Sequence, residues 1–172
     1  ARHIMAPLKS TAYEVPKSIK TAPEYSDSLS RYPMTDYTAP LRDITFSMFE
    51  VFDYQHHYET RFQGADVNPE LIGVILEEFG RFCSEQLSPL NAVGDQEGCT
   101  WNEGEVTTPD GFKEAYQQYV AGGWPALAGD PQYGGQGLPE SLSIILTEMR
   151  GTANWAWGMY PGLSHGAVNT IK

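Results

Sequence analysis

Histidine and cysteine side chains are the first candidates for chemistry, but their spacing supports neither a metal site nor a nucleophile. His56 and His57 are adjacent, so on a helix their side chains would diverge by about 100° and would not easily bind one ion. Fifteen residues separate Cys83 from Cys99, which fits neither a CxxC motif nor a zinc motif. Cys83 shares the register of neighbouring apolar residues, so we expect a buried thiol. We predict no metal site.

Ser164 and His165 form a dipeptide with the residue types of a hydrolase. A catalytic triad also needs a third group and a strained nucleophile elbow, and we find neither around this dipeptide. His165 could meet His56 and His57 in space, although nothing in the spacing requires it. We therefore name no catalytic residue in this chain.

The densest pattern is a glycine-rich segment, residues 122–139, with the sequence GGWPALAGDPQYGGQGLP. Six of its first sixteen residues are glycine, which permits close approach of the backbone to a ligand or to a neighbouring segment. No Gly-Lys-Ser/Thr follows and no strand precedes it, so it is neither a Walker loop nor a dinucleotide fingerprint. We interpret it as a structured loop between two helices.

The elements that must position these residues are helical. Apolar residues recur at three- and four-residue spacing, and we find no lasting strand alternation, so the sequence predicts an all-α fold. Asn68 and Pro69 mark one helix start, and Pro89 is expected to end that helix. We predict helices over residues 41–52, 69–88 and 109–121 and from 139 onward, an irregular connection over 91–110, and a glycine-containing tail over 154–172.

Composition divides the chain further and excludes some partners. We read residues 1–4 as an expression scar, 5–39 as an extended arm rich in proline and tyrosine, and 40–172 as the helical domain. The net charge is −11 and the pI about 4.6, which disfavours nucleic acid and anionic lipid surfaces. No apolar run approaches the ~20 residues of a membrane span. With only two cysteines, we expect a reducing, cytoplasmic location.

The glycine-rich segment and its surroundings resemble the N-terminal helical domain of acyl-CoA dehydrogenases. The resemblance runs from about Thr38 to Lys172 and includes features of the branch with an N-terminal extension, which acts on methylmercaptopropionyl-CoA and on long or unusual acyl-CoA substrates. Its matching segments are Gly123-Trp124, Ala126-Leu127-Ala128, Asp130-Pro131, Tyr133 to Pro139, Ile144 to Met149, Gly162 to Ala167, Ala39 to Asp43 and Thr108 to Phe112.

This resemblance implies a flavoprotein that uses FAD for the α,β-dehydrogenation of an acyl-CoA, in fatty acid metabolism. The catalytic base and most FAD contacts belong to a β-domain and a C-terminal bundle that are absent from this sequence. We therefore expect a fragment, truncated before the β-domain and inactive alone, with cofactor-binding residues unknown. The implied partners are the acyl-CoA substrate, an electron-accepting flavoprotein and, in a homo-oligomer, further copies of the chain.

In that family the N-terminal domain walls the acyl chain, so four residues of the tail are candidates for substrate binding. They are Trp155, Met159, Tyr160 and Leu163; ordinary core packing is the alternative for each. Pro161 is expected to bend or break any helix here. Two alternatives to the enzyme remain: a non-enzymatic helical interaction module, and a family member without dehydrogenase activity.

Overall fold

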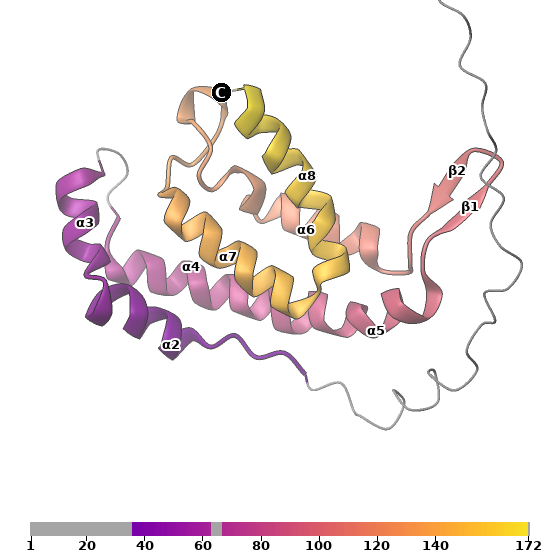
Figure 1. The fold of residues 1–172 in the computed structure, drawn as a ribbon, viewed down its shortest axis with the longest axis horizontal. Helices are drawn as coiled ribbons and strands as arrows, with labels where there is room; N and C mark the ends of the chain where they lie inside the picture. Colours follow the sequence, from indigo (N-terminus) through magenta and orange to yellow (C-terminus); the bar gives the residue numbers. More distant parts are fainter. Residues whose placement is uncertain (1–35, 63–66, 172) are drawn as a thin grey trace, which may run out of the picture. The chain divides into compact units, whose positions relative to one another are not determined.

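A computed structural model describes residues 36–62 and 67–171 of the 172-residue chain. The expectations for residues 1–35, including the scar and most of the arm, lie outside the described residues. The described part is largely helical, which confirms the predicted fold class (Figure 1). Its helices are α2 (Leu41–Thr45), α3 (Tyr54–Arg61), α4 (Pro69–Phe82), α5 (Ser88–Glu97), α6 (Phe112–Ala121), α7 (Glu140–Ala153) and α8 (Trp155–Ile171).

Helix α4 begins where its local sequence predicts. The Asn68 side chain accepts a hydrogen bond from the Leu71 amide at 2.9 Å, and Pro69 occupies the first turn, where a missing N–H costs nothing. The apolar side of α4, which includes Ile72, Leu76 and Phe79, is buried. One continuous apolar stripe therefore anchors α4 in the core.

The predicted end of this helix before Pro89 is wrong. The chain passes from α4 into a π-helical segment, Cys83–Leu87, and continues as α5 to Glu97. The Ser88 amide bonds to the Cys83 carbonyl, five residues back, and Pro89 then lies in the first turn of α5. The wider turn lets the helix absorb a proline that would otherwise interrupt its hydrogen bonding.

The prediction of an irregular connection over residues 91–110 is also wrong in part. It contains the end of α5 and an antiparallel hairpin of β1 (Thr100–Asn102) and β2 (Glu105–Thr107), in which Trp101 pairs with Val106. Glu103 and Gly104 both have positive φ, 48° and 93°, as the tight hairpin turn requires. Every residue of both strands is exposed, so burial imposes no alternation of polar and apolar residues on their sequence.

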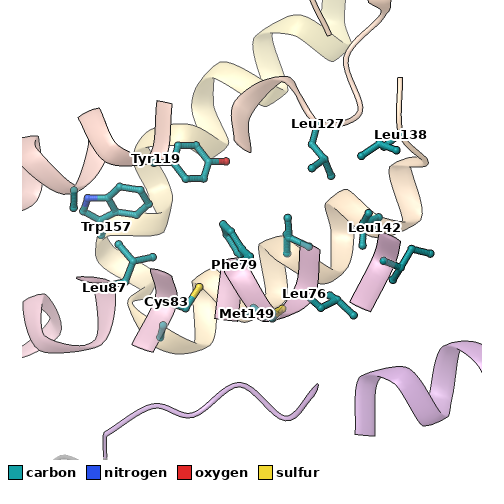
Figure 2. Packing of buried hydrophobic residues seen from close by; sticks show 14 of the residues in the cluster. Leu76, Phe79, Cys83, Leu87, Tyr119, Leu127, Leu138, Leu142, Met149 and Trp157 are labelled. Carbon is teal, nitrogen blue, oxygen red and sulfur yellow. The ribbon is translucent and has the colours of Figure 1, made fainter. Parts of the chain in front are cut away.

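The core lies between α4, its π-helical continuation, α6, α7 and α8 (Figure 2). Trp157 is fully buried there, and its Nε1 donates to the Phe112 carbonyl at 3.0 Å. The rings of Phe82 and Tyr119 lie 6.1 and 5.5 Å from the Trp157 ring, measured between centroids. Tyr37 joins the edge of the core, and its amide donates to the Ser88 hydroxyl at 3.1 Å.

Helices α7 and α8 form an antiparallel hairpin joined by one residue, Asn154 (Figure 1). The buried Asn154 side chain accepts from the Trp157 amide at 2.9 Å and donates to the Leu87 carbonyl at 3.1 Å. Beyond this corner α8 runs through Pro161 to Ile171, so Pro161, which was expected to bend or break the helix, does not break it. None of the described helices is both long enough and apolar enough to cross a membrane.

Candidate functional site

A cavity of about 410 Å³ lies between α6, α7, α8 and the first part of the glycine-rich loop. We call it the α7–α8 cavity. Helix α7 contributes Glu140, Ser143, Thr147 and Arg150 to its lining. These residues are spaced by three and four positions, which places them in one row along the helix. A polar stripe with an acid at one end and a base at the other therefore runs along the wall of this cavity.

The glycine-rich loop forms another wall and, as predicted, connects two helices, α6 and α7. Its own carbonyls accept its amide hydrogen bonds: Gly135 donates to Asp130 at 3.0 Å, and Gln136 donates to Ala126 at 2.8 Å. Gly137 likewise donates to Gly129 at 2.9 Å. Because these amides are already bonded, the loop does not present the row of free N–H groups that would cradle a phosphate.

Arg150 marks the basic end of the stripe and is almost fully buried. Its Nη1 donates to the Tyr119 hydroxyl at 3.1 Å, and its Cζ lies 5.9 Å from the centre of the Tyr119 ring. Burial raises the pKa of Tyr119, and the positive charge of Arg150 only partly opposes that rise. Tyr119 is therefore a neutral hydroxyl that orients the guanidinium.

Glu140 and His165 mark the opposite end of the stripe. A carboxylate oxygen of Glu140 lies 3.2 Å from His165 Nε2, and Asn169 Nδ2 lies 3.0 Å from the same nitrogen. His165 is thus engaged across the α7–α8 hairpin, and no trio of His, Cys, Asp or Glu suited to a metal ion occurs among residues 36–62 and 67–171. Both partners are about half exposed, so their contact contributes little to stability.

The four residues predicted to bind substrate lie on a different face of α8 from the cavity. Trp155, Met159 and Leu163 are 70%, 51% and 69% exposed, and none of them lines the α7–α8 cavity. Their four-residue spacing forms an apolar stripe on the surface. Tyr160 instead lines a second hollow of about 480 Å³ with Phe112 and Lys113, and its hydroxyl lies 3.8 Å from the Cys99 sulfur.

Sequence reasoning did not identify the cavity residues of α7. A charged residue near the end of a predicted helix ordinarily faces solvent, so nothing set Arg150 apart. The available signal was the spacing of Glu140, Ser143, Thr147 and Arg150, which aligns four polar side chains on a helix that also has an apolar face.

Cys83 is buried, as predicted. Burial raises the pKa of the Cys83 thiol to about 12, although the nearby Arg150 charge opposes the rise. Because the thiolate is the reactive form, a thiol reagent at pH 8 is expected to modify the exposed Cys99 rapidly and Cys83 only after unfolding in urea. Counting thiols with Ellman's reagent checks this; two fast thiols in the native protein, or one in the Cys99→Ser variant, would contradict it.

Comparison with known proteins adds one relative and no family model, since none of the protein-family models searched matches the chain. The relative is 3-methylmercaptopropionyl-CoA dehydrogenase of Ruegeria pomeroyi, 36% identical over 136 residues. The match covers 79% of this chain and 23% of the length of the relative. Over the part of the chain that this match covers, the protein belongs to the acyl-CoA dehydrogenase family.

Proposed function

We propose that this helical domain binds the acyl chain of the substrate in an FAD-dependent acyl-CoA dehydrogenase. The observation that carries the proposal is the exposed apolar stripe of Trp155, Met159 and Leu163 on α8. Large apolar side chains gathered on one surface mark a binding site or an interface. The match to an enzyme whose name specifies an acyl-CoA substrate supports assigning that surface to an acyl chain.

The glycine-rich loop does not fit the pyrophosphate of FAD, because its amides at Gly135, Gln136 and Gly137 bond within the loop. When bound, FAD supplies a hydride acceptor for the β-carbon of the acyl group. We assign neither its contacts nor the carboxylate base to this chain, and we propose that the rest of a longer protein provides them. The proposed partners are an acyl-CoA, an electron-accepting flavoprotein and further copies of the chain, in the cytoplasm.

The role that we propose for the α8 stripe is to hold the acyl chain away from water. Each CH₂ group that moves from water to an apolar wall contributes about 0.8 kcal/mol. Affinity should therefore rise with the length of the acyl chain for as long as the stripe can cover it. Holding the chain also positions the thioester end for reaction.

Substitution of Leu163 or Met159 by alanine tests this role in the flavin-loaded, full-length protein. Each change is expected to raise KM for hexanoyl-CoA or a longer acyl-CoA about tenfold, with little change in kcat, because apolar contact is lost equally in the ground and transition states. The measurement is the acyl-CoA concentration dependence of flavin bleaching. The expected penalty grows with acyl chain length.

Val74→Ala provides the matched control, since Val74 is an exposed apolar residue of a different helix, α4. It should leave KM unchanged. Equal effects of Val74→Ala and Leu163→Ala would contradict the assignment of the stripe. If no acyl-CoA bleaches the flavin of the wild-type protein, the proposed reaction is wrong, and a family member without dehydrogenase activity or a helical interaction module would replace it.

A further inference from the structure

Arg150 is held inside the bundle by three helices. It extends from α7, its Nη1 bonds to Tyr119 of α6, and its side chain passes beside Gly158 of α8. A Cβ at position 158 would lie 3.5 Å from the Arg150 Nε, which is ordinary van der Waals contact, so the Arg150 side chain packs directly against this part of α8. The side chain is 8% exposed and lines the α7–α8 cavity.

The charge of Arg150 lacks an acidic partner among the described residues. The contacts recorded there between basic and acidic side chains join Arg81 to Glu78 and His165 to Glu140. The Arg150 Nε makes no hydrogen bond, and the recorded bond of the guanidinium is the one to the neutral Tyr119 hydroxyl. A guanidinium has five N–H donors, and a buried charge is costly unless it is paired. An anion in the cavity would balance the charge of Arg150 and accept hydrogen bonds from its free N–H groups.

The electrostatics of the cavity point to a ligand with one negative end. Glu140 lies ten residues from Arg150 along α7, which is about 15 Å at the α-helical rise. Its carboxylate is paired with His165 at the far end of the cavity and disfavours a second anion there. The remaining titratable groups of the lining are the hydroxyls of Tyr116 and Tyr119. One guanidinium can bind one carboxylate through two parallel hydrogen bonds, whereas it would leave the second charge of a phosphate unpaired.

We infer that the α7–α8 cavity binds a carboxylate through Arg150, with the attached carbon chain extending along the cavity. A volume of about 410 Å³ is within the usual range for small-molecule sites. Carboxylate binding does not depend on the proposed function.

The test compares hexanoate with 1-hexanol, two probes that share a six-carbon chain, by titration calorimetry. Wild-type protein is expected to bind hexanoate at least tenfold more tightly, and Arg150→Met to lose that preference while its affinity for 1-hexanol is unchanged. Arg81→Met is the matched control, because Arg81 is an exposed arginine of α4. Should Arg150→Met not fold, Arg150→Lys carries the same comparison, since lysine keeps the charge and loses the planar fork.

Equal binding of the two probes by the wild-type protein overturns the inference, as does undiminished hexanoate binding by Arg150→Met. Parallel loss of both probes would show a structural role only and also overturn it.

Discussion

Substitution of Trp157 by alanine is expected to lower the free energy of unfolding by about 3–5 kcal/mol, the usual range for removing a buried aromatic side chain. Trp157 is fully buried, and its indole donates to the Phe112 carbonyl across the core. The substitution leaves a cavity beside Phe82 and Tyr119 and removes the hydrogen bond between α8 and the Phe112 carbonyl. Because small domains are stable by only about 5–15 kcal/mol, urea denaturation followed by circular dichroism should show a large loss.

Trp155 provides a matched control two residues away on the same helix. It is largely exposed, so Trp155→Ala should cost about 1 kcal/mol or less. Trp157→Phe restores most of the ring volume but not the hydrogen bond, and should fall between the two at about 1–3 kcal/mol. Similar losses for Trp155→Ala and Trp157→Ala would contradict the placement of Trp157 at the centre of the core.

Substitution of Gly135 by alanine is the second change with a large expected effect. A Cβ at this position would overlap the backbone carbonyl of Gly129, and two backbone segments cannot relieve the overlap as a flexible side chain could. We expect a loss of about 1–3 kcal/mol, the usual cost of overpacking, with larger values possible where the backbone must move. Gly129 also lines the α7–α8 cavity, so hexanoate binding should weaken in the same variant.

The neighbouring Gly134 separates steric overlap from backbone conformation. Its φ is 83°, and nothing lies within 4 Å of a Cβ built there. Asparagine tolerates left-handed backbone geometry, so Gly134→Asn should cost only a few tenths of a kcal/mol. Urea denaturation of both variants checks the comparison. If Gly134→Asn lowered the free energy of unfolding as much as Gly135→Ala, backbone conformation and not steric overlap would be the main constraint on the loop.

Local signals explain why parts of the fold could be predicted. Asn68, Pro69 and the apolar spacing that follows them define the start of α4 without help from distant residues. The continuation past Pro89 could not be read this way. It depends on the π-helical turn at Cys83–Leu87, whose cost the buried Cys83 and Leu87 offset by packing.

The candidate site shows the same division between local and distant information. Trp155, Met159 and Leu163 could be named as candidates from the resemblance to acyl-CoA dehydrogenases. Their exposure, which distinguishes Trp155 from the buried Trp157, is fixed only once the other helices are in place. Arg150 is a stronger case, because its burial places it against Tyr119 of α6 and Gly158 of α8. Both residues are remote in sequence or unremarkable by type, so periodicity alone does not identify the pocket.

Asn154 is the single residue between α7 and α8, so it is the pivot for any change in the angle between the two helices. Gly158 lies about 6 Å from this pivot and His165 about 16 Å, so a rotation of roughly 10° would displace them by about 1 Å and 3 Å. The contact between Glu140 and His165, 3.2 Å long, would part while the contact between Arg150 and Gly158 persisted. The separation of Glu140 and His165 at the open end of the hairpin thus depends on the two hydrogen bonds of Asn154. Asn154 itself does not line the cavity.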